Sequence, residues 1–109
     1  IDSMNLNEFG DMIRNSDILP EYINTGVARL IDKNTIKLRC YERAVNGESL
    51  SCGASAAATV VVATELGMCK KGEDITVKMP GGDLVITYTD ETILVNGDTY
   101  KVYEGVVEY

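Results

Sequence analysis

The feature that most limits how this chain can fold is an almost wholly apolar segment near its middle. Residues 54–66, with Gly53 as an alternative start, contain only Ala, Ser, Thr, Val and Leu besides one charge, Glu65, near the end. Gly67 follows, and glycine commonly ends α-helices because it tolerates a left-handed backbone. The segment therefore predicts a helix, and a helix that is apolar on every side must be surrounded by protein.

Alternating patterns on both sides of this segment predict β-strands. In residues 35–42, Ile36, Leu38 and Cys40 alternate with charged or polar residues, which is the period of a strand with one buried face. Further strands are expected at residues 24–31, 74–79, 83–88, 92–95 and 99–107. Together these elements predict an α+β fold, in which a mixed, mostly antiparallel sheet curls around the central apolar helix.

Turn residues predict how the strands are joined. Asp32-Lys33-Asn34 predicts a hairpin between the first two strands, and a polar loop is expected at residues 44–51. Asn96-Gly97 predicts another hairpin, because both residues tolerate positive φ. Tyr100 and Tyr103 would then lie on a strand and, like Tyr41, act as core or cross-strand residues.

The first residues predict a short amphipathic helix at 5–14. Leu6, Phe9 and Ile13 fall on one of its faces, and Asn5 is the expected N-cap. The 109 residues fit a single domain, with residues 1–19 as a helix and linker and residues 20–109 as the core. Residues 1–4 lack the positively charged region of a signal peptide. Because the chain starts with Ile1 and a helix signal follows at once, we expect a piece of a longer protein.

Charge and cysteine content exclude several classes of function. The net charge of −7 repels phosphate backbones and anionic lipids, so neither nucleic acid nor a membrane is an expected partner. Cys40, Cys52 and Cys69 form no CxxC pair and the chain has no histidine, so we expect no metal site and no disulfide scaffold. The expected location is the reducing cytoplasm, and Cys40 and Cys69 are expected to be packing residues.

Cys52 is the residue best placed for chemistry, because it directly precedes the apolar helix. The first N–H groups of a helix lack internal partners and carry partial positive charge, which stabilises a thiolate. The same groups, from Gly53 to Ser55, can hold a carboxylate. This combination suits removal of a proton from a carbon beside a carboxylate. Position alone leaves open the commoner role of a free cysteine, a small buried hydrophobic residue.

Several motifs in a fixed order extend this argument. They are Pro20 with Asn24, Cys40-Tyr41-Glu42-Arg43, Gly47-Glu48-Ser49-Leu50-Ser51-Cys52-Gly53, Met79-Pro80-Gly81-Gly82-Asp83-Leu84 and Val102-Tyr103-Glu104-Gly105. Their order and spacing resemble the C-terminal half of the diaminopimelate epimerase family, over residues 20–109. The resemblance implies a cofactor-independent isomerase of lysine and cell-wall precursor synthesis, built from two similar halves with an amino-acid substrate between them.

The resemblance also implies roles for individual residues. A thiolate of one half removes the α-proton and a thiol of the other half reprotonates the opposite face, and Cys52 matches the cysteine of the second half. Glu42 and Arg43 match residues that bind the distal ammonium and carboxylate of the substrate, which agrees with their charges. Asn24 matches another residue of the family that contacts the distal end of the substrate. With the N-terminal domain missing, the isolated chain is expected to be inactive.

The chain departs from the family pattern in two places. Where the family has Thr or Ser and then Gly after Cys-Gly, this chain has Cys52-Gly53-Ala54-Ser55, so Ala54 offers a carboxylate only its backbone N–H. The loop at residues 43–48 is one residue longer than usual and has Ala44 in place of Gly. These differences affect the binding of the carboxylate and the choice of substrate, but leave the proton-moving group in place.

Three alternatives stay open. The first is a racemase of the same fold with another substrate, such as proline racemase. The second is a noncatalytic module that binds a carboxylate or packs against a partner, in which Glu42-Arg43 would be a solvated charge pair. The third is a homodimer that brings two Cys52 thiols together.

Overall fold

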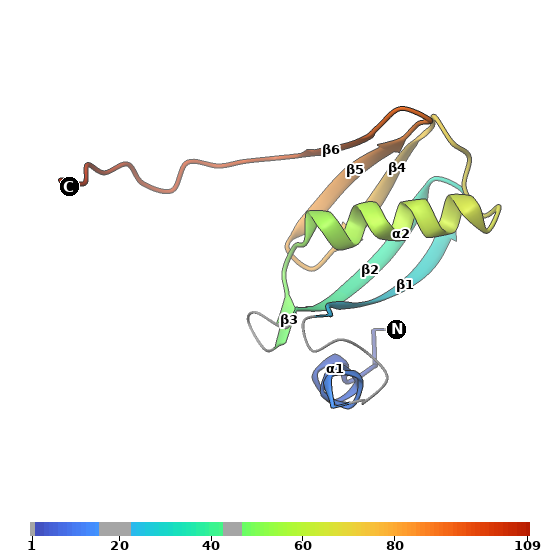
Figure 1. The fold of residues 1–109 in the computed structure, drawn as a ribbon, viewed down its shortest axis with the longest axis horizontal. Coiled ribbons are helices and arrows are strands. Elements are labelled where there is room, and N and C mark those ends of the chain that lie inside the picture. Colours follow the sequence, from blue (N-terminus) through green and yellow to red (C-terminus); the bar gives the residue numbers. More distant parts are fainter. Residues whose placement is uncertain (1, 16–22, 43–46) are drawn as a thin grey trace.

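One mixed sheet and one long helix make up most of the described chain. The structure is a computed structural model and describes residues 2–15, 23–42 and 47–109. In chain order the elements are α1 (Leu6–Arg14), β1 (Thr25–Asp32), β2 (Thr35–Glu42), β3 (Gly47–Ser49), α2 (Gly53–Glu65), β4 (Asp74–Met79), β5 (Gly82–Tyr88) and β6 (Ile93–Gly97). Helix α2 lies across one face of the sheet (Figure 1), which confirms the predicted α+β class.

The sheet is antiparallel except at its centre. Its strand order is β1-β2-β4-β5-β6, and β3 pairs with β2 off this path. Among the described strands only β2 and β4 run parallel, in a register that sets Ile36 beside Val77. A parallel pair needs a crossover connection, and α2 lies within that connection, so the topology itself brings the helix onto the sheet.

Small side chains let α2 pack closely on the sheet. Ala56, Val60 and Ala63 recur at the spacing of one helix face and are buried. They share one core cluster with residues of β2, β4 and β5, namely Ile36, Leu38, Ile75, Val77 and Ile86. The helix ends as predicted at Gly67, which has a φ of 80°, and the Met68 N–H donates to the Ala63 carbonyl.

The opposite face of α2 is open, so the expectation of a helix surrounded on every side is wrong within this chain. Val62 is 57% exposed and Leu66 67% exposed, and Ala58 is exposed on the same helix. The sheet ends at β1, which among the described strands pairs only with β2. The described strands are too few to close around the helix, and an apolar face and a sheet edge remain exposed.

The predicted hairpin at Asn96-Gly97 is also wrong. Both residues lie within β6, opposite Val85 and Leu84 of β5. A Cβ on Gly97 would lie 2.6 Å from the Leu84 Cδ2 atom, so a larger residue there would displace the end of the Leu84 side chain. The turn lies between β5 and β6, where the Thr89 N–H donates to the Thr92 carbonyl.

No strand forms at residues 99–107, contrary to the prediction. Residues 98–109 have no regular secondary structure and run away from the sheet (Figure 1). Tyr100 is 82% exposed and Tyr103 87% exposed, so neither is a core or cross-strand residue of the described domain.

Helix α1 packs against β2 and β3 and is capped as predicted. The Asn5 side chain accepts a hydrogen bond from the Glu8 N–H at 3.2 Å. Gly10 lies so close to the ring of Tyr41 that a side chain there would overlap it. The Tyr41 hydroxyl donates to the Asp11 carboxylate at 2.9 Å, and Tyr41 is buried, as the sequence predicted. Neither α1 nor α2, the helices of the described residues, is long and apolar enough to span a bilayer.

Replacing Val60 by alanine is expected to destabilise the 109-residue chain by about 2 kcal/mol, because the side chain is fully buried between α2 and the sheet. Val62→Ala on the exposed face of the same helix is the matched control, with an expected change within about 0.5 kcal/mol. Urea unfolding of both variants measures the difference. Equal losses would contradict the one-sided packing of α2.

Candidate active site

The register of the strands gathers several predicted site residues at one end of the sheet. Thr25, the residue after Asn24, pairs with Tyr41, the residue before Glu42, so Asn24 and Glu42 flank the same end of this strand pair. Glu42 pairs with Gly47 of β3, and β3 leads within a few residues to Cys52. Residues 47–49, expected in a loop, form this strand because they continue the ladder along β2. Arg43 was expected at the same place and lies outside the described residues.

Cys52 is the N-cap of α2, as its position in the sequence predicted. Its backbone is extended, with φ −149° and ψ 103°, and its carbonyl accepts the N–H of Ala56 at 3.0 Å. The Cys52 side chain makes no capping hydrogen bond, and the first turn has no acidic residue. The N–H groups of Gly53, Ala54 and Ser55 precede the first helical bond and therefore form the positive end of the helix.

The sulfur of Cys52 points into the domain and contacts a hydroxyl. Only 9% of the residue is exposed, and the thiol donates to Ser55 Oγ at 3.3 Å. Cys40 Sγ lies 3.1 Å from the same oxygen. Cys40 is fully buried, as a packing residue should be, but its contact with the site was not predicted. No sequence pattern links residues on a strand and a helix whose pairing depends on the tertiary fold.

The environment of Cys40 favours its neutral form. Burial raises the pKa of the Cys40 thiol, the hydrogen bond with Ser55 opposes this rise, and the nearby Cys52 and Glu42 add to it. Glu42 lies two residues along β2 from Cys40 and so points to the same side of the sheet, toward α2. Burial also raises the pKa of Cys69, which is buried as expected.

An ion pair holds β3 and the loop that leads to Cys52. Arg39 Nε lies 2.8 Å from one Glu48 carboxylate oxygen and Arg39 Nη2 2.8 Å from the other. Arg39 Nη1 also donates to the Met4 carbonyl at 2.8 Å, which ties the segment before α1 to the same group. The hydrogen bond from Arg39 lowers the pKa of Glu48. Glu48 therefore stabilises the motif that ends at Cys52.

The Pro80-Gly81-Gly82 turn supports the same loop from β4 and β5. The Gly81 N–H donates to the Leu50 carbonyl at 2.7 Å, two residues before Cys52. A Cβ on Gly81 would lie 2.7 Å from that carbonyl oxygen, so only glycine allows this approach. Gly82 has a φ of 139°, which also favours glycine. This motif of the sequence thus fixes the backbone that carries the thiol.

Gly53 and Ala54 form the accessible side of the helix start. Ala54 is exposed and Gly53 half-buried. A Cβ on Gly53 would meet only Val95 Cγ1, at an ordinary 3.8 Å, and Gly53 is not among the residues with positive φ. The packing of the described domain therefore does not require glycine at this position.

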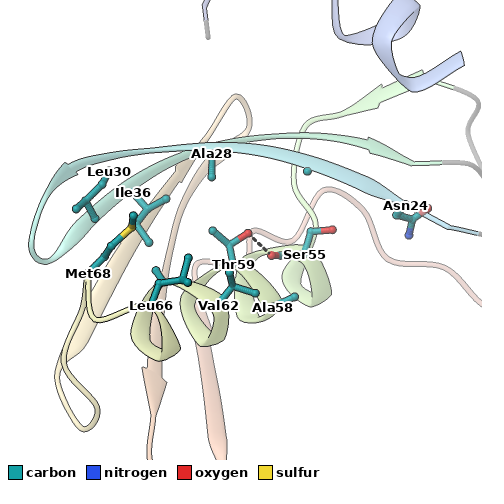
Figure 2. Close-up of a pocket in the computed structure, with 12 residues that line it drawn as sticks. Asn24, Ala28, Leu30, Ile36, Ser55, Ala58, Thr59, Val62, Leu66 and Met68 are labelled. Carbon is teal, nitrogen blue, oxygen red and sulfur yellow. Dashed lines mark hydrogen bonds between the residues drawn. The ribbon is translucent and has the colours of Figure 1, made fainter. Parts of the chain in front are cut away.

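A groove of about 360 Å³ runs between α2 and β1. Figure 2 shows Leu30, Ile36, Leu66 and Met68 at one end and Asn24 toward the other. Ser55 also lines the groove, and its carbonyl accepts from the Thr59 hydroxyl at 2.7 Å. Cys52 does not line it. The walls of the groove are mainly apolar, with Asn24, Ser55 and Thr59 as its polar side chains.

Metal ligands do not gather near this site. Within residues 2–15, 23–42 and 47–109 there is no group of three or more His, Cys, Asp or Glu side chains that could hold a metal ion. The described polar groups of the site are thiols, a hydroxyl, a carboxylate and backbone N–H groups, and these can move a proton and bind an anion.

This α+β domain, with a thiol at the start of its central helix, matches one family of proteins. The sequence pattern described as diaminopimelate epimerase covers residues 1–107. The diaminopimelate epimerase of Bacillus cytotoxicus is 34% identical over 105 residues, which are 95% of this chain and 36% of that protein. That of Afipia carboxidovorans is 38% identical over 112 residues, or 99% and 37% of the two chains. The chain belongs to the diaminopimelate epimerase family.

The matches cover only part of each relative. The diaminopimelate epimerase of Archaeoglobus fulgidus is 39% identical over 95 residues, which are 87% of this chain and 33% of that protein. The chain thus spans between a third and two fifths of the length of these relatives.

Replacing Glu48 by glutamine is expected to lower the free energy of unfolding by about 1 kcal/mol at pH 7, because the pair with Arg39 is bidentate and only part-buried. The folded pKa of Glu48 lies below its ordinary value of 4.5, so the contribution is complete above that value and is lost as the pH falls through the folded pKa. Urea unfolding at pH 7, 5 and 3 should show the difference from wild type shrinking in acid.

Glu104→Gln is the control for this experiment. Glu104 pairs with Lys101 in the exposed tail, where both side chains are more than 70% exposed, and its loss should not change stability at any of these pH values. A difference for Glu48→Gln that stays constant from pH 7 to pH 3 would contradict the assigned ion pair.

Proposed function

We propose that this chain forms part of the active site of a diaminopimelate epimerase, which interconverts L,L- and meso-diaminopimelate without a cofactor. The observation that carries the proposal is the position of Cys52 as N-cap of α2, beside backbone N–H groups that the Cys52 side chain does not cap. The names of the relatives supply the substrate. The acidic charge and the free cysteines fit a cytoplasmic enzyme of lysine and peptidoglycan precursor synthesis.

Cys52 acts as one of two acid/base groups. As a thiolate it takes the proton from the α-carbon, so that an S–H bond forms while the electron pair of the C–H bond moves into the carboxylate. The N–H groups of Gly53 and Ala54 bind that carboxylate as its negative charge grows. A second thiol, from the part of the protein outside this chain, protonates the opposite face of the carbon and inverts it.

Asn24, Glu42 and Arg43 bind the distal end of the substrate in this proposal. The Glu42 carboxylate suits an ammonium group, and the Arg43 guanidinium suits a carboxylate. The pairing of Thr25 with Tyr41, whose chain neighbours are Asn24 and Glu42, supports a shared binding region at this end of the sheet. Such a region lies at the same sheet end as Cys52, as one substrate requires.

The rest of the protein is the partner that the open side of the domain would accept. The exposed face of α2, the free edge of β1 and the apolar groove between them all lie on one side of the fold. The exposed tail adds further apolar side chains, Tyr100, Val102, Tyr103, Val106 and Val107. Relatives more than twice as long as this chain provide ample sequence to cover these surfaces.

A second candidate function is a noncatalytic module in which Cys52 only packs. The 9% exposure of Cys52 and its absence from the groove favour this alternative. A racemase of the same fold with a different substrate, such as proline, would use the same thiol. The noncatalytic module would form no product, and the two isomerases would act on different substrates. Activity measurements therefore distinguish these candidates.

Replacing Cys52 by alanine in the complete protein is expected to reduce epimerisation of L,L-diaminopimelate by at least about 1,000-fold, since the α-proton then has no acceptor on one face. Incorporation of solvent deuterium at the α-carbon and formation of the meso isomer are both measured. Cys69→Ala, at the other end of α2, is the matched control and should retain activity within a few-fold.

Two further measurements complete this test. The 109-residue chain alone should show no epimerase turnover, because in this proposal it supplies only one of the two acid/base thiols, Cys52. Ordinary rates from the isolated chain, or a Cys52→Ala protein with wild-type activity, would refute the proposed mechanism. Racemisation of proline in place of diaminopimelate would establish the alternative substrate.

Replacing Val62 by lysine tests the covering of α2. In the 109-residue chain the change should leave the free energy of unfolding within about 0.5 kcal/mol, because the side chain is exposed. In the complete protein it should destabilise by about 2–4 kcal/mol, because a charge would be buried against the covering segment. Urea unfolding measures the change in both proteins.

Analytical ultracentrifugation tests whether a second copy of the chain covers α2 instead. In that case the isolated chain would sediment as a dimer, and Val62→Lys would make it a monomer.

A further inference from the structure

Ser55 connects two thiols at the start of α2. Its hydroxyl oxygen lies 3.3 Å from Cys52 Sγ and 3.1 Å from Cys40 Sγ, within the range of hydrogen bonds to sulfur. Cys40 lies in the interior of β2, where it pairs with Gly26 on one side and Ser49 on the other. The three side chains therefore form a hydrogen-bonded chain that runs from the centre of the sheet to the first turn of the helix.

We propose that Ser55 is a positioning residue for Cys52: it holds Sγ at the start of α2 and donates a hydrogen bond to the sulfur when the thiol loses its proton. The inference rests on the proposed role of Cys52 as an acid/base group. Ser55 acts through Cys52 and does not itself touch the substrate.

The hydroxyl of Ser55 can serve both states of Cys52, because it carries one rotatable donor and two acceptor lone pairs. With Cys52 as a thiol, its S–H donates to Ser55 Oγ and the Ser55 O–H donates to Cys40 Sγ. With Cys52 as a thiolate, the Ser55 O–H turns to Cys52 Sγ and the Cys40 S–H donates to Ser55 Oγ. Only the proton of Cys52 leaves the cluster, so the proton count is preserved.

Cys40 has the properties that this arrangement needs. It has no exposed surface, and burial raises its pKa, so it stays protonated and remains a donor while Cys52 ionises. Its place between two strands fixes the sulfur, which in turn fixes the Ser55 hydroxyl. A hydrogen bond to a charged acceptor is stronger than one to a neutral acceptor, so the Ser55 hydroxyl holds the Cys52 sulfur more firmly once the proton has left.

The test uses the complete protein with Ser55→Ala, Ser55→Thr and the control Ser51→Ala. Ser51 is an exposed serine directly before Cys52, and its contacts do not include either thiol in the described structure. Ser55→Thr retains the hydroxyl, and its added methyl group has room because Ser55 lines the groove beside α2. Iodoacetamide alkylation of Cys52, resolved from Cys40 and Cys69 by peptide mass spectrometry, is followed from pH 6 to 10.

Ser55→Ala should move the midpoint of the Cys52 alkylation profile upward by about one pH unit, which slows alkylation about tenfold at neutral pH. Ser55→Thr should restore most of the wild-type profile, and Ser51→Ala should not change it. The rate of epimerisation should rise with pH as Cys52 becomes a thiolate. The midpoint of this rise should also move upward in Ser55→Ala. A purely structural role of Ser55 would lower stability and leave these midpoints in place.

An alkylation profile of Ser55→Ala that coincides with wild type would overturn the inference, whatever the enzyme does. Cys40→Ala and Cys40→Ser provide a second arm: loss of the S–H donor should shift the profile in the direction of Ser55→Ala, whereas the serine hydroxyl should preserve it. If the alkylation profiles shift as expected but Cys52→Ala leaves epimerisation intact, the proposed function is wrong. The role of Ser55 in positioning Cys52 is then still supported. The two failures are therefore distinguishable.

Discussion

The packing of the small-residue face of α2 against the sheet is the contact on which the rest of the structure depends. Ala56, Val60 and Ala63 allow the helix to lie directly on β2, β4 and β5, and the parallel pairing of β2 with β4 requires a crossover there. The position of the helix on the sheet fixes the position of its first turn. Cys52, the free N–H groups and Ser55 thereby come to lie beside Cys40.

The polar and glycine motifs on both sides of α2 serve mainly to hold this first turn. Arg39 and Glu48 brace β3 on one side, and the Gly81 N–H holds the Leu50 carbonyl on the other. The loop before Cys52 is thus tied to two separate parts of the sheet. A proton-transfer group benefits from such support, because small displacements of the sulfur from the reacting carbon reduce the rate strongly.

The open side of α2 has a physical consequence for the whole protein. Val62 and Leu66 expose apolar surface, and among the described strands β1 pairs on one side only, with β2. Further strands that paired with the edge of β1 and packed on α2 would form hydrogen bonds with the β1 backbone and bury the apolar face of the helix. In the function proposed above, the segment that covers α2 also carries the second acid/base thiol.

The sequence by itself determined the elements whose signals are local: the apolar helix and its end at Gly67, the caps, the alternating strand β2, and the place of Cys52 at the helix start. Only the tertiary structure decided that Asn96-Gly97 continues a strand, that Tyr100 and Tyr103 leave the domain, and that Cys40 meets Ser55. The physical reason is that helix periodicity and caps depend on residues a few positions apart, whereas strand partners, close approaches and thiol contacts join residues that only the packing of the sheet brings together.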